Sequence, residues 1–209
     1  MPYLSEFFVV LVVHLLAVMS PGPDFVLISR NSLIYSKRTA ISTALGLALG
    51  ILVHVTYSLV GIGFIISRSV LLFSALKLLG AGYLVYIGYR SFRAAAPKAD
   101  ALAPAVQRDP PPRTAIRTGF LTNVLNPKAT LFFFALFTQV INPKTPKMIQ
   151  VFYGLEMSLM TFIWFSVVAA ILSHRLVKKN FSTVQHRLER AFGVVLMALG
   201  IKVALSSTK

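Results

Sequence analysis

The sequence predicts an all-α integral membrane protein with six transmembrane helices, arranged as two inverted three-helix repeats with broken first and fourth helices. Only 13% of the 209 residues are charged, which is about half the share expected in a soluble domain. Hydrophobic residues make up 56% of the chain and the mean hydropathy is +0.74. The apolar residues occur in runs that reach the roughly 20 residues needed to cross a bilayer.

The first expected span covers residues 4–35 and is interrupted near its middle. From Phe7 to Met19 only His14 is not apolar, and Ser20-Pro21-Gly22-Pro23-Asp24 follows at once. Two prolines and a glycine in three positions cannot continue an α-helix, because proline lacks the N–H group and clashes with the preceding turn. Inside a membrane such a break must be buried in protein or line a wet cavity, so it is a candidate site.

The remaining elements follow from apolar runs and from the polar segments between them. The expected spans are 39–66, 71–93, 116–141 (interrupted at Asn126-Pro127), 147–173 and 185–206. A linker over 94–115 is too polar and too rich in proline to span. The chain thus divides into a first three-helix repeat (1–93), the linker (94–115) and a second three-helix repeat (116–209).

Weak internal symmetry supports this division. A shift of 104 residues places Pro23 on Pro127, Asp24 on Lys128 and Gly50 on Gly154. With three spans on each side of the linker, the two halves must have opposite orientations in the membrane. A broken helix that opens each half is the pattern that points to the binding site of a secondary transporter.

The positive charges predict the orientation. The formal net charge is +15, yet the basic residues gather between apolar runs, which argues against nucleic acid as a partner. Fourteen Lys and Arg residues flank the loops after spans one, three and five, against six on the other side. We therefore expect both termini outside and the linker in the cytoplasm. No basic residue precedes Arg30, so we expect the first apolar segment to be retained, not cleaved as a signal peptide.

Each break is expected to restart a helix. Ser20 can cap the helix that begins near Pro23-Asp24, and Asn126 can cap the one that begins at Pro127-Lys128. The N-terminus of a restarted half-helix presents unpaired N–H groups and partial positive charge, so it can bind a carboxylate. An amino acid is an obvious guest, with Asp24 holding its ammonium group or a proton. In the alternative interpretation Asp24 only caps its own helix and pairs with Lys128.

Other polar residues within the spans are candidates for the same site. Glu156 lies near the middle of the fifth span, where a carboxylate is costly and usually functional, although a packing hydrogen bond to a neighbouring Ser or Thr is the alternative. The candidate substrate-binding residues are Ser20, Pro21, Gly22, Pro23, Asp24, Asn123, Asn126, Pro127, Lys128 and Glu156. The candidate proton-coupling residues are Asp24, Glu156 and His54.

The histidines favour packing over chemistry. His54 continues the line of Gly46 and Gly50 at four-residue spacing, which places it on a face that packs against another helix. A packed, hydrogen-bonded histidine is therefore preferred over a proton relay, and packing is also the default for His14. Together with Asp24 and Glu156 the histidines could form a divalent-metal site, but the four ligands are scattered over three spans. We predict no bound metal.

The sequence contains no phosphate-binding loop, nucleophile elbow or HExxH motif, so it does not predict an enzyme. Cysteine is absent, which excludes disulfides and cysteine-based metal sites, and no cofactor is expected. A homodimer is compatible with the sequence but is not required by it, because the Gly46–Gly50 face can also pack within one chain.

The chain resembles the LysE/RhtB family of bacterial amino-acid exporters. The similarity lies in residues 14–24, in Gly46-x-x-x-Gly50, in Gly80–Tyr89 and in Gly119–Ala129, which holds Asn-Pro-Lys-Ala. It implies an inner-membrane exporter of small amino acids, driven by proton antiport through alternating access. The Met-Ser-Pro-Gly-Pro-Asp form is most similar to the threonine/homoserine branch, and the partners implied are an amino acid, protons and the lipid bilayer. The alternatives are a divalent-cation exporter and a non-transporting membrane scaffold.

Overall fold

The computed structural model describes residues 2–20, 22–68, 108–142 and 144–173, together with single positions between 78 and 93 and between 194 and 205. Six helices are defined in these parts of the chain: α1 (Pro2–Met19), α2 (Pro23–Ile34), α3 (Lys37–Arg68), α5 (Pro112–Val124), α6 (Pro127–Gln139) and α7 (Lys147–Leu172). The described residues form no strand, so the predicted all-helical class is confirmed. The expected spans 71–93 and 185–206, and most of the linker, lie outside the described residues, as does Pro21.

The helices have the length and composition of a multi-pass membrane protein. Of the described helices, α3 and α7 are long and apolar enough to cross a bilayer, and the pairs α1–α2 and α5–α6 qualify if each is counted as one span. Each pair is bent by 57° at its break. Both expected interruptions are therefore present, because the prolines at positions 23 and 127 can begin a helix but cannot continue one.

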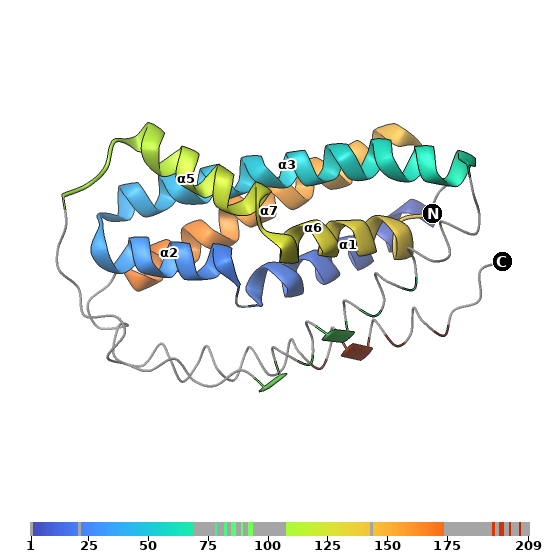
Figure 1. Ribbon diagram of the computed structural model, residues 1–209, viewed down its shortest axis with the longest axis horizontal. Coiled ribbons are helices and arrows are strands. Elements are labelled where there is room, and N and C mark those ends of the chain that lie inside the picture. Colours follow the sequence, from blue (N-terminus) through green and yellow to red (C-terminus); the bar gives the residue numbers. More distant parts are fainter. Residues whose placement is uncertain are drawn as a thin grey trace.

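The two broken spans run in opposite directions and their breaks lie close together near the middle of the bundle (Figure 1). α3 packs against α2, α5 and α6, and α7 packs against α1, α2 and α3. Helix α5 begins at Pro112, four residues before the expected start at 116. Proline at the first helical position needs no intrahelical partner for its missing N–H, so the proline-rich end of the linker can start the helix.

The closest crossing in the bundle joins α3 to α5. A Cβ atom on Gly46 would lie 2.0 Å from the carbonyl oxygen of Ile116, and one on Gly119 would lie 2.2 Å from that of Thr43. The expected Gly46–Gly50 face is thus in backbone contact with α5. At Gly50 the space of the missing side chain is taken by the amide of Asn123. Glycine at these positions lets α5 approach α3 closely, and this close approach places Asn123 inside the bundle.

Two apolar cores flank the breaks. One joins α1, α3, α6 and α7 and includes Val10, Phe133 and Met157. The other joins α2, α3 and α7 and includes Ile28 and Phe165. The two broken spans change direction between these cores. The side chains of the two cores therefore leave space unfilled at the level of the breaks.

Candidate functional site

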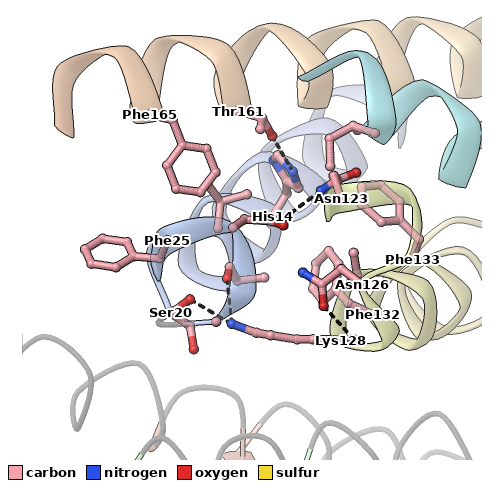
Figure 2. Close-up of a pocket in the computed structure, with 16 residues that line it drawn as sticks. His14, Ser20, Phe25, Asn123, Asn126, Lys128, Phe132, Phe133, Thr161 and Phe165 are labelled. Atoms are coloured by element: carbon pink, nitrogen blue, oxygen red, sulfur yellow. Dashed lines mark hydrogen bonds between the residues drawn. The ribbon is translucent and has the colours of Figure 1, made fainter. Parts of the chain in front are cut away.

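A cavity of about 440 Å³, including the part that opens to solvent, lies where the two breaks meet. Its wall is formed by both broken spans, by α7 and by Ile51 of α3 (Figure 2). The polar lining residues are His14, Ser20, Asp24, Asn123, Asn126, Lys128 and Thr161. The remaining lining residues are Gly22 and apolar or aromatic side chains. A cavity in which a few polar groups converge among apolar side chains is typical of a small-molecule site.

The first break is shaped by Gly22. Helix α1 continues through Ser20, whose N–H donates to the carbonyl of Leu16 at 3.1 Å. Gly22, in an extended conformation, then occupies the N-cap position of α2, and no side chain caps that helix. The prediction that Ser20 caps α2 is therefore wrong, because Gly22 holds the N-cap position and Ser20 lies two residues before it, at the end of α1. Asp24 lies in the first turn of α2, as expected.

The second break has a side-chain cap. The Oδ1 atom of Asn126 accepts a hydrogen bond from the backbone N–H of Lys128 at 3.0 Å, and α6 begins at Pro127. The predicted cap is confirmed. Asn126 is buried, so its amide orders the start of α6 at the wall of the cavity.

Each half-helix sends a side chain across to the other broken span. The Nζ group of Lys128 donates to the carbonyl of Ser20 at 2.7 Å and to that of Ala17 at 3.5 Å, which places a cation at the C-terminus of α1. In the other direction, Asp24 Oδ2 accepts a hydrogen bond from Asn123 Nδ2 at 2.7 Å. Gly22 makes room for Lys128, since a Cβ there would lie 3.1 Å from Lys128 Cδ.

Among the described residues, three buried polar atoms of cavity-lining side chains have no hydrogen-bond partner. They are Oδ1 of Asp24, Oδ1 of Asn123 and Nδ1 of His14. Unsatisfied buried polar atoms are rare in folded proteins and call for a ligand, a water molecule or a functional reason. Asn123 Oδ1 lies against Gly50 of α3, whereas the free oxygen of the Asp24 carboxylate can accept a hydrogen bond from an ammonium group.

His54 follows the packing interpretation. Its Nε2 atom contacts the carbonyl oxygen of Asn123 at 3.0 Å, and its Nδ1 atom is hydrogen-bonded to the hydroxyl of Tyr57. The ring is buried and stacks on Phe133 with 5.5 Å between centroids. It is not among the residues that line the cavity. His54 instead anchors the end of α5, the helix that positions Asn123.

Glu156 lies apart from the cavity and is not one of its lining residues. Both of its carboxylate oxygens are buried without a hydrogen-bond partner. The alternative that Glu156 forms a packing hydrogen bond to a Ser or Thr is therefore wrong. The polar contact between α7 and α3 at this level is made by Ser158, whose hydroxyl donates to the carbonyl of Ala48 at 2.8 Å.

The four side chains of the alternative divalent-metal site do not come together. Within the described parts of the chain, no three His, Asp or Glu side chains are grouped closely enough to hold a metal ion. Asp24 and His14 line the cavity, whereas His54 and Glu156 do not.

Sequence reasoning missed the part of the cavity formed by His14 and Thr161. His14 is 1% exposed and lines the cavity, and its Nε2 atom contacts Thr161 Oγ1 at 3.3 Å. The signal was available: His14, Ala17 and Val18 have the i, i+3, i+4 spacing of one helix face, and that face leads to the break. For Thr161 on α7 the sequence offers no comparable signal.

Two oppositely directed broken spans that meet at a buried polar cavity define the class of multi-pass membrane transport proteins. Comparison with known families agrees. The profile of the LysE type translocators matches residues 15–207, and the chain belongs to this family. The protein is accordingly a transporter and not an enzyme.

Similar proteins share nearly the full length of the chain. The threonine efflux protein of Salmonella typhi is 29% identical over 97% of this chain and 99% of its own length. The threonine efflux protein of Escherichia coli K12 is 28% identical over 97% and 99%. The homoserine/homoserine lactone efflux protein of Salmonella typhimurium is 32% identical over 94% of this chain and 95% of its own. No solved structure matches the chain.

Proposed function

We propose that the protein exports small neutral amino acids, such as threonine or homoserine, across the bacterial inner membrane in exchange for protons. The family and the names of its relatives support amino-acid efflux. The observation that carries the proposal is the buried, unsatisfied Oδ1 atom of Asp24 in a cavity between two half-helix ends. A scaffold without transport activity would instead have tightly packed breaks.

The two ends of an amino acid fit different groups of this cavity. The ammonium group would lie against Asp24 Oδ1, the carboxylate oxygen that has no partner among the described residues. The carboxylate would lie near Lys128 and the first turns of α2 and α6, where N–H groups and helix dipoles favour an anion. The substrate is thus recognised by the features that all amino acids share.

Transport would proceed by alternating access of two inverted repeats around this cavity. The equal bends of 57° and the opposite directions of the two broken spans support this mechanism. The crossed contacts of Asp24 and Lys128 hold the two breaks together, so substrate binding at Asp24 can bias how the halves move. Asp24 would exchange the proton, because an ammonium ion and a proton compete for one carboxylate. Glu156 is half-buried and does not line the cavity, and its covered carboxylate oxygens have no partner among the described residues, so it is the second candidate proton carrier.

The proposed orientation places both termini outside and the 94–115 linker in the cytoplasm. At one end of the bundle, Asp109 before α5 accepts a hydrogen bond from the N–H of Ser36 in the α2–α3 loop at 2.8 Å. At the other end, Glu6 near the N-terminus accepts hydrogen bonds from Thr145 and Asn142 of the α6–α7 loop. These pairs support the grouping of loops on which the charge-based orientation rests.

Transport in proteoliposomes tests the proposal. Threonine efflux should accelerate when a pH gradient is imposed, and equal flux with and without the gradient would refute proton antiport. Asp24→Asn should remain folded and lose transport. Asp109→Asn is the matched control, because it makes the same chemical change outside the cavity and should transport normally. Normal transport by Asp24→Asn would mean that Asp24 has only a structural role.

A further inference from the structure

The cavity has a second polar end, formed by His14. This residue lies on α1, is 1% exposed and lines the cavity together with Phe132 and Phe133 of α6. Its ring centroid is 6.3 Å from that of Phe132 and 5.9 Å from that of Phe133. Figure 2 shows His14 beneath Thr161 of α7, with Asn123 next to it in this view and Ser20 and Lys128 farther away. The imidazole is thus a polar group of the cavity wall that lies beside the aromatic side chains of α6.

Only one of the two ring nitrogens of His14 has a partner. Nε2 contacts Thr161 Oγ1 at 3.3 Å, and Thr161 is fully buried. Nδ1 is buried and makes no hydrogen bond. Because a hydroxyl can donate or accept, Thr161 can hold either tautomer, and Nδ1 then takes the complementary role. A buried polar atom that is held in place but unpaired is suited to receive a ligand group.

His14 shares one face of α1 with apolar lining residues. Ala17 and Val18 follow His14 at helical spacing and also line the cavity, which suits the aliphatic part of a ligand.

We propose that His14 is the specificity-determining residue for a hydroxyl group on the side chain of the transported amino acid. Its Nδ1 atom forms the hydrogen bond, and Thr161 is a positioning residue that holds the ring through Nε2. This inference rests on the proposed function, since it assumes that an amino acid occupies the cavity with its charged groups at the breaks. It adds that the aromatic end selects hydroxylated side chains.

Selection follows from the cost of leaving a buried group unpaired. Threonine and valine have nearly the same shape, but valine has a methyl group where threonine has its hydroxyl. With valine bound, Nδ1 would be sealed from water without a partner, whereas threonine would satisfy it. Sites built to hydrogen-bond a substrate hydroxyl reject the analogue that lacks it. For one such bond we expect threonine to bind about 10- to 100-fold more tightly than valine.

Binding of L-threonine and L-valine to detergent-solubilised protein tests the inference. The readout is the dissociation constant of valine divided by that of threonine. His14→Phe removes the ring nitrogens and should bring the ratio close to one, mainly through weaker binding of threonine. Thr161→Val should lower the ratio about tenfold or less with the fold preserved, since the substitution is nearly isosteric. Thr161→Ser keeps the hydroxyl and should restore the ratio. Thr118→Val, on the exposed side of α5, is the control and should leave it unchanged.

The outcomes separate this inference from the proposed function. If the wild-type protein binds amino acids but does not distinguish threonine from valine, the role of His14 is refuted and amino-acid transport is not. An unchanged ratio in folded His14→Phe, or in Thr161→Val if His14→Phe does not fold, also refutes it. If the wild-type protein binds no amino acid, the proposed function fails and this inference fails with it.

Discussion

The Nδ2 group of Asn123 donates a hydrogen bond to Oδ2 of Asp24 across 2.7 Å, and this bond joins the two broken spans at the cavity wall. Asn123 is held from three sides: its carbonyl contacts His54, its side chain fills the space above Gly50, and its amide binds Asp24. The carboxylate that the proposed mechanism needs is therefore oriented by the other half of the molecule. The second carboxylate oxygen of Asp24, Oδ1, has no partner among the described residues and is available to a ligand.

Exchanging Asp24 and Asn123 tests the hydrogen bond between them separately from the position of the negative charge. The double variant Asp24→Asn with Asn123→Asp restores a carboxylate–amide pair but moves the charge from α2 to α5. We expect its thermal midpoint to stay near that of the wild type and its threonine flux to be lost. Asn123→Ala, which removes the hydrogen bond from Asn123 to Asp24, should cost about 1–3 kcal/mol of stability. Full transport by the exchanged pair would mean that the hydrogen bond matters and the position of the charge does not.

Lys128 should be required for the stability of the first break. Lys128→Met removes the donor to the carbonyls of Ser20 and Ala17 and the cation at the C-terminus of α1. Since hydrogen bonds from charged groups are the stronger ones, we expect a loss of about 1.5–3 kcal/mol, together with loss of transport. Lys144→Met, in the exposed α6–α7 loop, is the control for removing one lysine. Equal thermal midpoints for the two variants would contradict this role.

The α3–α5 crossing should not tolerate a methyl group. In Gly46→Ala the new Cβ would lie 2.0 Å from the carbonyl oxygen of Ile116, so the helices would have to separate. Overpacking of this kind costs about 1–3 kcal/mol, and displacement of α5 would also move Asn123 away from Asp24. Gly61→Ala, on the same helix as Gly46, is the matched control, because no atom lies within 4 Å of the Cβ that it would add. Thermal unfolding in detergent and threonine flux should therefore distinguish the two variants.

The contact between Asp109 and Ser36 should be independent of pH in the physiological range. Hydrogen bonds from the side chain and the backbone N–H of Ser36 hold the pKa of the Asp109 carboxyl below its usual range. A lowered pKa in the folded state means that the contact is fully present above the ordinary aspartate value of about 4 and is lost as the pH falls below it.

Hydrogen exchange measures this contact directly. After correction for intrinsic rates, protection of the Ser36 amide should be constant from about pH 8 to pH 5 and fall only in stronger acid. Asp109→Asn should weaken the protection and remove its dependence on pH. Loss of protection between pH 5 and pH 7 in the wild type would contradict the assignment to Asp109.

The orientation can be tested on a chain that lacks cysteine. Single cysteines introduced as Lys144→Cys and Arg113→Cys lie in exposed positions at opposite ends of the bundle. In intact cells a membrane-impermeant maleimide should label position 144 and not position 113. After the membrane is opened, both should react. The reverse pattern in intact cells would invert the proposed topology.

The sequence by itself determined the helical class, the two breaks and the nearness of Asp24 to the first break. Proline has no N–H and clashes with the preceding turn, so Pro23 and Pro127 could only begin helices, whatever surrounded them. Asn126 was identifiable as a cap because capping involves groups two residues apart. Distance along a helix is proportional to sequence separation, so the nearness of Asp24 to the break was also readable.

Only the tertiary structure decided which side chains share the cavity. Glu156 and His14 both looked like isolated polar groups in spans, but packing turned His14 toward the breaks and left Glu156 away from them. The bonds from Asn123 to Asp24 and from Lys128 to Ser20 join residues about one hundred positions apart. Such contacts depend on the rotation of each helix about its axis and on the close α3–α5 crossing. These are set by the packing of whole surfaces, and no local pattern of residues encodes them.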